Sequence, residues 1–332
     1  MVILLYLANP IIGGWVSFTS HLSLLLNVPI YRISNKTNSN AKKHFGYGTY
    51  YTDITLDNLL TLNKTIIITA VDRCNVEYLN KLKNKKCNLI INSIHQIYKN
   101  DLENYLYKYI KYFKIITIRN TIKTWILKNQ ILSNENILFI NPPYMRIAPK
   151  MTQDDIKYKS GCVCISRIDY SKKIDIILKA NNLLLTPIKL YGIRNKKYCE
   201  NVLKPLELDN LKDRQPNSNY YGKFQKSFIT LNKILNNCKF LIDLSTIDND
   251  GDGLLYTFME AIDFNCALIL HDDWVNTRPG IFKPGINCLS VKNEYEIVDI
   301  LESELDTTSI IKNAKQLINI YSEINNWKTL VN

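Results

Sequence analysis

Residues 245–270 read STIDNDGDGLLYTFMEAIDFNCALIL, and this stretch decides the fold class. Asp252 and Glu260 are separated there by seven residues, and Gly253 directly follows the first acid. Apolar runs at residues 240–244 and 267–270 flank the segment and are typical of buried strands. Strand, glycine-containing loop, helix and strand in this order predict a βαβ unit of a parallel sheet.

The helix of such a unit begins at the carboxyl edge of the sheet, where α/β proteins bind ligands. Its free backbone N–H groups can bind a phosphate, and Gly253 lets the phosphate approach closely. Glu260, about two turns into the helix, can accept hydrogen bonds from sugar hydroxyls. The alternative is a solvated acidic loop followed by an exposed glutamate on an amphipathic helix.

Two segments together resemble a known family. Asp252-Gly253 followed by FMEA at residues 258–261 resembles the E-x7-E motif of retaining GT-B glycosyltransferases, with Asp in place of the first Glu. Leu255 stands where that motif has its second glycine. Residues 166–175 read SRIDYSKKID and are similar to the family's GRLD-x-x-KG-[IV]-D segment.

The second segment carries the phosphate chemistry of the resemblance. It places Arg167 and Lys172 at the family's phosphate-binding positions, while Ser166 and Lys173 replace its two glycines. Two cations at a strand-to-helix turn can clamp a diphosphate, because Arg offers a planar fork of donors and Lys a point charge.

The length and the resemblance predict two domains. A chain of 332 residues with 46% hydrophobic content can bury two cores. The resemblance implies an α/β GT-B fold, in which two Rossmann-like domains place their parallel sheets toward a central cleft. The expected division is 1–145 for an acceptor-side domain, 146–315 for a nucleotide-sugar-binding domain and 316–332 for a helix that crosses back to the first. An Asn-Pro-Pro break at residues 141–143 is the expected linker.

The first half of the chain contributes weaker candidates. Gly13 and Gly14 lie between a predicted strand at residues 2–7 and a predicted helix at 15–26, and His95 follows a predicted strand at 88–94. The resemblance places this glycine loop and this histidine beside the reacting sugar, whereas a tight turn and a structural histidine are the alternatives. His21 is predicted to be packed within its helix. Residues 31–51, rich in Lys and Tyr, predict a solvated loop or a surface for nucleic acid or polysaccharide. Residues 102–113 predict a helix.

The activity implied by the resemblance is sugar transfer from a nucleotide diphosphate-sugar, with UDP-glucose the expected donor and retention at the anomeric carbon. No cofactor and no metal are expected, because two cations can stabilise the leaving diphosphate. The resemblance gives catalytic roles to Arg167, Lys172, His95 and Asp252, and donor binding to Gly13, Gly14, Gly253, Leu254 and Glu260.

Other chemistries are disfavoured by the sequence. Residues 248–253 read DNDGDG and fit the first half of an EF-hand loop, but Met259 stands where that loop needs a glutamate. Eight scattered cysteines without a C-x-x-C pair predict reduced thiols rather than a zinc site. The absence of a dinucleotide fingerprint, a Walker A motif and a G-x-S-x-G elbow argues against dehydrogenases, P-loop NTPases and α/β-hydrolases.

The net charge of +12 has two explanations, an AT-rich genome that supplies lysine or a polyanionic partner. The first hypothesis for the acceptor is a hydroxymethylated base in phage or viral DNA, held through the basic surface. The second is a cell-surface polysaccharide or glycolipid, with the charge serving an anionic membrane. A catalytically inactive nucleotide-binding protein is the third. No apolar run reaches the ~18 residues of a membrane span and no signal peptide is recognisable, so a cytoplasmic protein is expected.

Overall fold

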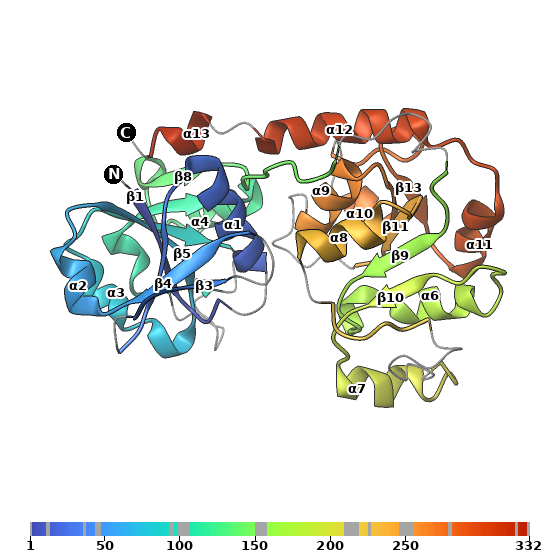
Figure 1. Ribbon diagram of the computed structural model, residues 1–332, viewed down its shortest axis with the longest axis horizontal. Coiled ribbons are helices and arrows are strands. Elements are labelled where there is room, and N and C mark those ends of the chain that lie inside the picture. Colours follow the sequence, from blue (N-terminus) through green and yellow to red (C-terminus); the bar gives the residue numbers. More distant parts are fainter. Residues whose placement is uncertain are drawn as a thin grey trace. The chain divides into compact units, whose positions relative to one another are not determined.

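The chain forms two compact units in the computed structural model, which describes residues 2–10, 14–35, 38–43, 48–92, 96–97, 106–149, 158–208, 219–224, 227–245, 255–277, 281–322 and 325–330. Unit 1 extends to Met145 and takes up the chain again from Ile320, whereas unit 2 lies between Arg146 and Asn319 (Figure 1). Tyr256 belongs to unit 1 as well.

Unit 1 is built on an eight-stranded sheet with the strand order β3-β4-β2-β1-β5-β6-β7-β8. All neighbouring strands pair in parallel except β3 and β4. Most residues of its central strands are apolar and buried, as expected for a parallel sheet covered on both faces. The strands are β1 (Val2–Leu7), β2 (Ile30–Ile33), β3 (Asn38–Lys43), β4 (Tyr50–Ile54), β5 (Thr65–Val71), β6 (Cys87–Ile91), β7 (Lys114–Thr117) and β8 (Ile137–Phe139).

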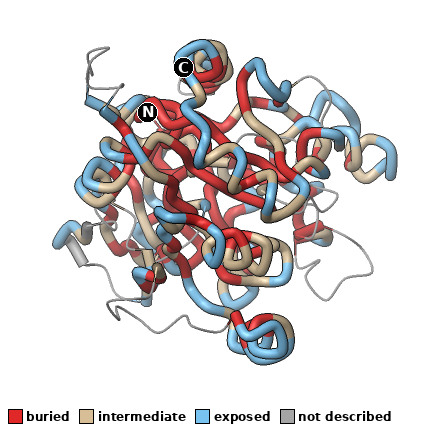
Figure 2. The backbone as a smooth tube through the Cα atoms, turned by 90° about the vertical axis from the view of Figure 1, so that its right-hand side faces the viewer, coloured by how far each residue is buried: buried red, intermediate tan, exposed pale blue. Residues whose placement is uncertain are grey.

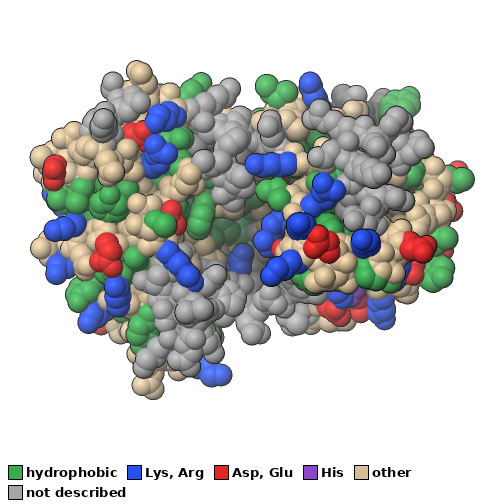
Figure 3. Space-filling model, turned by 90° about the horizontal axis from the view of Figure 1, so that it is seen from below, with side chains coloured by type: hydrophobic (Ala, Val, Ile, Leu, Met, Phe, Trp, Pro, Cys, Tyr) green, Lys and Arg blue, Asp and Glu red, His purple; other side chains and the backbone are tan. Residues whose placement is uncertain are grey.

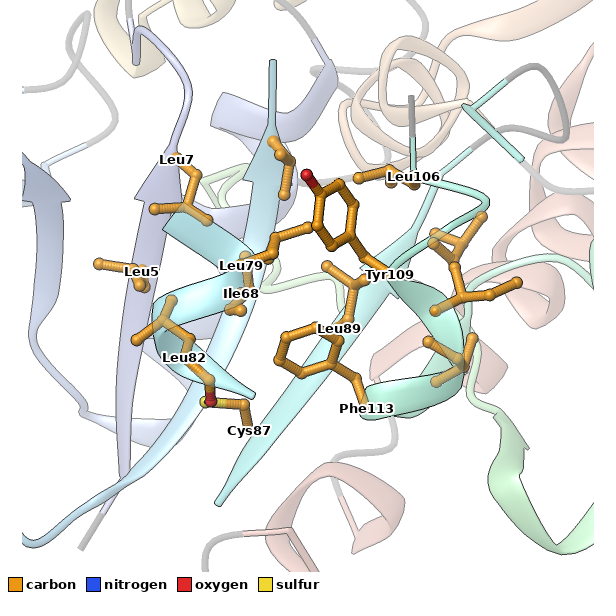
Figure 4. Close-up of a cluster of buried hydrophobic side chains, with 14 of the residues drawn as sticks. Leu5, Leu7, Ile68, Leu79, Leu82, Cys87, Leu89, Leu106, Tyr109 and Phe113 are labelled. Atoms are coloured by element: carbon orange, nitrogen blue, oxygen red, sulfur yellow. The ribbon is translucent and has the colours of Figure 1, made fainter. Parts of the chain in front are cut away.

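Short helices pack their apolar residues against this sheet. In Figure 4, Leu79 and Leu82 of α3 and the rings of Tyr109 and Phe113 lie against leucines of β1 and β6. The unit 1 helices are α1 (Gly14–Leu26), α2 (Leu56–Thr61), α3 (Tyr78–Leu82), α4 (Asn120–Lys128) and α13 (Asn325–Lys328), and its 3₁₀ turns are η1 (Arg73–Asn75), η3 (Ile110–Tyr112) and η4 (Asn134–Asn136).

Two expectations for unit 1 were wrong. The expected loop at residues 31–51 contains parts of three strands, because buried Asp53 of β4 is paired with Arg32 of β2 at 2.7 Å and with Lys42 of β3. These long-range pairs let a polar segment form a sheet edge. The described part of the expected helix at 102–113 forms only turns and η3, with Tyr109 buried in the core.

The C-terminal segment packs into unit 1. Trp327 of α13 is fully buried, and its indole Nε1 donates to the Asn141 carbonyl at 3.0 Å. Its ring lies edge-on to Phe18 of α1, with the ring centroids 5.6 Å apart. The core of unit 1 is therefore completed by residues that follow unit 2 in the sequence.

Unit 2 is built on a five-stranded parallel sheet with the order β10-β9-β11-β12-β13. Its strands are β9 (Cys162–Ile165), β10 (Lys189–Tyr191), β11 (Phe240–Asp243), β12 (Ala267–His271) and β13 (Leu289–Val291). Its helical segments are η5 (Tyr170–Lys172), α6 (Ile174–Asn181), α7 (Lys196–Tyr198), the π-helical turn η6 (Cys199–Leu203), α8 (Phe228–Leu235), α9 (Tyr256–Asp263), α10 (Asp272–Thr277), α11 (Glu294–Glu302) and α12 (Thr308–Ser322).

A buried ammonium group ties the amino-terminal side of unit 2 to two helices. Lys159 precedes β9, and its Nζ donates to the carbonyls of Leu235 at the end of α8, at 2.7 Å, and of Phe264 just after α9. A cation is favourable at a helix C-terminus because the carbonyls there carry partial negative charge.

The predicted α/β class with parallel sheets is confirmed. Figure 2 shows buried residues along the inner parts of the backbone and exposed residues at its periphery. Most residues of the central strands are buried. In the described part of the chain, no helix has the length and apolar character needed to cross a membrane.

Candidate functional site

The strand order of unit 2 places a topological switch point between β9 and β11. The chain leaves β9 for β10 on one side of it, and continues from β11 to β12 on the other. In open parallel sheets, ligands bind outside the carboxyl ends of the two strands that flank such a point. A ligand site is therefore expected among the residues that follow Ile165 of β9 and Asp243 of β11.

Lys172 reaches across this switch point. Its Nζ donates to the hydroxyl of Ser245, which follows β11, and that hydroxyl donates to the Asp243 carboxylate. The backbone N–H of Ser245 donates to the same carboxylate oxygen at 2.9 Å. A half-buried cation is thus fixed at the carboxyl ends of two neighbouring strands, where an anionic ligand would meet it.

The turn after β9 sets the direction of both cations that the sequence indicated. Asp169 accepts a hydrogen bond from the Tyr170 N–H at 2.8 Å and caps the 3₁₀ turn that carries Lys172. Arg167 is 67% exposed, and its Nη1 lies 3.5 Å from Asp169 Oδ2. Because this ion pair is solvated, it holds the guanidinium only loosely, and Arg167 is free to bind a ligand.

The ends of β9 and β10 approach each other closely at Gly192. A Cβ atom at this glycine would lie 1.7 Å from the Ser166 carbonyl oxygen. The Gly192 carbonyl accepts a hydrogen bond from the Tyr220 hydroxyl at 2.7 Å. Any side chain at position 192 would push apart the strand end that carries Ser166 and Arg167.

A second polar cluster lies at the carboxyl end of β12. Lys173 Nζ is 2.8 Å from Asp273 Oδ2 and 3.0 Å from Nε2 of His271. Burial, with Lys173 as the next cause, lowers the pKa of His271, so its ring is neutral at pH 7. The consecutive lysines 172 and 173 therefore reach the ends of two different strands, β11 and β12.

Glu260 lies in α9 and is 0% exposed. The alternative of an exposed glutamate on an amphipathic helix is therefore wrong. Ionisable side chains are rarely buried without a specific role, because removing a carboxylate from water is costly.

The remaining sequence candidates belong largely to other parts of the chain. Gly14 begins α1 and is exposed, and a Cβ added there would meet no atom within 4 Å, so packing does not require a glycine at this position. His21 is buried as expected, accepts the Met145 N–H at 3.0 Å and stacks on Tyr256. The candidates Gly13, His95, Asp252, Gly253 and Leu254, and the EF-hand-like residues 248–253, lie outside the described residues.

Several polar groups of unit 2 escaped the sequence interpretation. They are Asp243, Ser245, Lys173, His271 and Asp273. Each follows or ends a buried strand, or adjoins a predicted phosphate ligand, and polar residues directly after apolar strand runs are the signal that points to them. Their mutual contacts depend on the strand order, which the sequence does not specify.

The described cysteines are free thiols, and all but Cys74 are buried. Burial raises the pKa of Cys87 and of Cys288 to about 12, which makes both thiols poor nucleophiles at neutral pH. Within the residues that the structure describes, no group of three or more His, Cys, Asp or Glu side chains is arranged to hold a metal ion.

Basic side chains are prominent on the surface. On the face drawn in Figure 3, several Lys and Arg side chains lie close together on unit 2, at the right, and others are spread over unit 1.

Comparison with known proteins identifies the fold. No protein-family model and no curated protein sequence matches the chain. Among solved structures, Anabaena Alr3699/HepE in complex with UDP and glucose aligns over 99% of both chains with a TM-score of 0.67 and 12% identity. Sucrose-phosphate synthase from Thermosynechococcus elongatus aligns over 100% of this chain and 96% of its own, with a TM-score of 0.66 and 12% identity.

A third similar structure is the lipopolysaccharide outer core galactosyltransferase WaaB. It aligns over 99% of this chain and 98% of its own, with a TM-score of 0.56 and 14% identity. At these identities the likeness extends to the architecture alone. The two α/β units with parallel sheets, matched along almost the whole chain, have the GT-B fold.

Proposed function

We propose that this protein is a glycosyltransferase that moves a sugar, glucose in the first instance, from a UDP-sugar to an acceptor hydroxyl with retention of configuration. The observation that carries the proposal is Lys172, whose ammonium is held by Ser245 at the switch point of unit 2. The HepE structures with UDP and UDP-glucose support the choice of donor, because that protein shares the fold over nearly its full length.

In the proposed reaction, the bond between the anomeric carbon and the diphosphate oxygen breaks, and a bond from that carbon to the acceptor oxygen forms. The acceptor proton passes to the leaving phosphate oxygen. Arg167 and Lys172 stabilise the negative charge that develops on the diphosphate, which is the electrostatic work that contributes most in many enzymes.

The other roles follow from the family resemblance. Glu260 accepts hydrogen bonds from the nucleotide ribose. Asp252, with the backbone of Gly253 and Leu254, binds the transferred sugar. His95 and the Gly13-Gly14 loop contact the reacting face. The two cations serve where other transferases use a metal, so the proposed reaction proceeds without one.

The donor site is tested by thermal unfolding with a panel of nucleotide diphosphates and their sugars. A ligand at 100 times its dissociation constant should add about 2.7 kcal/mol of stability. We expect UDP and UDP-glucose to stabilise the protein, and Lys172→Met to lose this effect. Lys189→Met is the matched control, because Lys189 is exposed at the amino-terminal end of β10 in the same sheet.

One outcome of this experiment would reject the site, and another would reject catalysis. Equal stabilisation of Lys172→Met and the parent would remove the proposed site. Stabilisation without hydrolysis or transfer of the sugar, for any acceptor tried, would instead favour an inactive nucleotide-binding protein. Asp252 and Leu255, which stand in place of the family's Glu and Gly, motivate that hypothesis.

For the acceptor, we propose a hydroxymethylated base in DNA, supported by the net charge of +12. Binding of duplex DNA should then weaken steeply with salt, because lysines that neutralise phosphates release counterions. Transfer of labelled glucose to DNA that contains hydroxymethylcytosine is the direct measurement, with unmodified DNA as the control.

A cell-surface glycan is the second candidate acceptor. The similar structure of WaaB, a lipopolysaccharide galactosyltransferase, favours it. Flotation with anionic vesicles and transfer to lipopolysaccharide core acceptors would support this candidate, and a salt-independent association with DNA would exclude the first.

A further inference from the structure

The backbone of Lys173 adopts a conformation that normally calls for glycine. Its φ and ψ are 44° and 42°, in the left-handed region, between the 3₁₀ turn of Lys172 and the start of α6. Glycine enters this region without a steric penalty, whereas a Cβ atom disfavours it. The similar family segment has glycine here, so this chain keeps the turn although its residue opposes it.

The Lys173 side chain provides contacts that offset this strain. Its ammonium is 2.8 Å from Asp273 Oδ2, and 3.0 and 3.3 Å from Nε2 and Nδ1 of His271. The lysine is only one-quarter exposed. The left-handed turn thus directs Lys173 to the end of β12, while Lys172, one residue earlier, reaches Ser245 beyond β11.

His271 is held in a neutral state by its surroundings. The Asp273 N–H donates to its Nδ1 at 3.1 Å, so a neutral ring carries its proton on Nε2, and the approach of the Lys173 ammonium to Nε2 is not a hydrogen bond. Nδ1 also lies 3.2 Å from Asp273 Oδ2. The groups facing the ring are Lys173 before α6, Asp272 and Asp273 of α10, and the Lys292 backbone after β13. Lys292 Nζ lies 3.8 Å from Asp272, so that acid is partly neutralised. A proton on His271 would place a second positive charge beside the Lys173 ammonium.

We propose that Lys173 is a positioning residue, which acts through Lys172: its ion pair with Asp273, beside the His271 ring, fixes the left-handed turn that aims Lys172 at the donor diphosphate. This inference rests on the proposed function, because the diphosphate is the ligand that Lys172 meets. It also makes donor affinity depend on pH, since protonated His271 repels Lys173 and loosens the turn.

The test compares two substitutions at one position. Lys173→Ala keeps a Cβ atom but loses the contacts, whereas Lys173→Gly loses the contacts and takes the left-handed turn without strain. By calorimetric titration with UDP-glucose at pH 7.5, we expect Lys173→Ala to bind about tenfold more weakly and Lys173→Gly to stay within about twofold of the parent. Lys196→Ala is the control, because Lys196 is 87% exposed and pairs with Glu200 of the adjoining turn η6.

The pH dependence gives a readout that simple loss of packing would not change. Both phosphates of UDP-glucose are esterified, so its charge is constant between pH 5.5 and 7.5. Burial, with Lys173 as the next cause, lowers the pKa of His271, so its protonation, and with it a loss of affinity of the parent, is expected as the pH falls below the ordinary histidine value of about 6.5. Lys173→Gly and His271→Gln should bind equally well at pH 5.5 and 7.5.

The outcomes decide between the claims. If the affinities of the parent and of His271→Gln for UDP-glucose follow the same pH dependence, or if Lys173→Ala binds as the parent does, the positioning role is wrong and the proposed function stands. If the folded parent binds no nucleotide sugar at either pH, the proposed function fails, and the positioning role fails with it. If Lys173→Ala does not fold, the positioning role is still tested by comparing how the UDP-glucose affinities of the parent and of His271→Gln change with pH.

Discussion

The two units place their parallel strands in the same way but differ in what lies at the carboxyl edge. In unit 2, the switch point between β9 and β11 is bridged by an ammonium, a hydroxyl and a carboxylate, Lys172, Ser245 and Asp243. In unit 1, the switch point lies between β1 and β5, where the Asp72 N–H donates to the Leu7 carbonyl at 3.0 Å.

At the unit 1 switch point, the side chains of Asp72, Thr19 and Thr69 form hydrogen bonds with other residues of the same unit. The Asp72 carboxylate caps η1 by accepting the Asn75 N–H at 2.9 Å. The hydroxyls of Thr19 in α1 and Thr69 in β5 form a buried hydrogen bond of 2.8 Å. The same topology therefore holds an ammonium beside a carboxylate at the edge of unit 2, whereas the described contacts at the edge of unit 1 serve packing.

The largest effect is expected where unit 1 depends on packing. Trp327→Ala should lower the free energy of unfolding by about 3–5 kcal/mol, because it empties a fully buried site against Phe18 and frees the Asn141 carbonyl. Urea denaturation measures this loss. Tyr158→Ala, at a side chain that is 86% exposed in unit 2, should change stability by less than about 0.5 kcal/mol. Equal losses for the two variants would contradict the role assigned to Trp327.

A substitution among Lys172, Ser245 and Asp243 at the carboxyl edge of unit 2 should change the affinity for the donor. Ser245→Ala removes the hydroxyl that joins Lys172 to Asp243, so UDP-glucose should bind about tenfold more weakly, in line with one hydrogen bond to a charged group. Calorimetric titration measures the change, and Ser245→Thr, which keeps the hydroxyl, should recover most of the affinity. An unchanged affinity for the Ala variant would show that Ser245 does not fix the lysine.

A matched loss of a hydroxyl in unit 1 sharpens the contrast. Thr69→Val removes the buried hydrogen bond to Thr19 and should lower stability by about 1 kcal/mol. The affinity for UDP-glucose should be the same as in the parent. A tenfold loss of donor affinity would mean that the unit 1 edge also takes part in holding the donor.

The smallest effect concerns the charged sheet edge of unit 1. Burial alone would raise the pKa of Asp53, but Arg32 and Lys42 outweigh it and lower the pKa below its ordinary value. A carboxyl with a depressed folded-state pKa stabilises the protein above its unfolded-state pKa of about 3.9, and this contribution is lost as the pH falls through the folded-state value. Thermal unfolding of Asp53→Asn and the parent should therefore differ at pH 7, and the difference should shrink as the pH falls below about 3.9. A constant difference would exclude this linkage.

The fold was largely predictable because its central strands are consecutive apolar residues separated by helical patterns. The sequence failed where burial depends on distant partners. Asp53 gave no sign of lying in a strand, since its pairing with Arg32 and Lys42 exists only once β2, β3 and β4 are adjacent.

The same limit applies to the site. The strand-to-helix turn of Arg167 and Lys172 was predictable from local pattern, but the contact of Lys172 with Ser245 spans 73 residues and depends on β9 lying beside β11. The left-handed backbone of Lys173 was not predictable from its residue type, because a lysine normally avoids the conformation that glycine adopts. The roles of His95, Asp252, Gly253, Leu254 and Gly13 stay predictions.

The burial of Trp327 in unit 1 has a consequence for synthesis on the ribosome. Met145 ends the first stretch of this unit, and the residue that fills its core follows 182 positions later. At about 5–20 residues per second, the ribosome needs roughly 10–35 s to make that interval. The nascent unit 1 spends this time with its site beside Phe18 unfilled, exposed to chaperones, so the half of the chain that is made first is the half that is finished last.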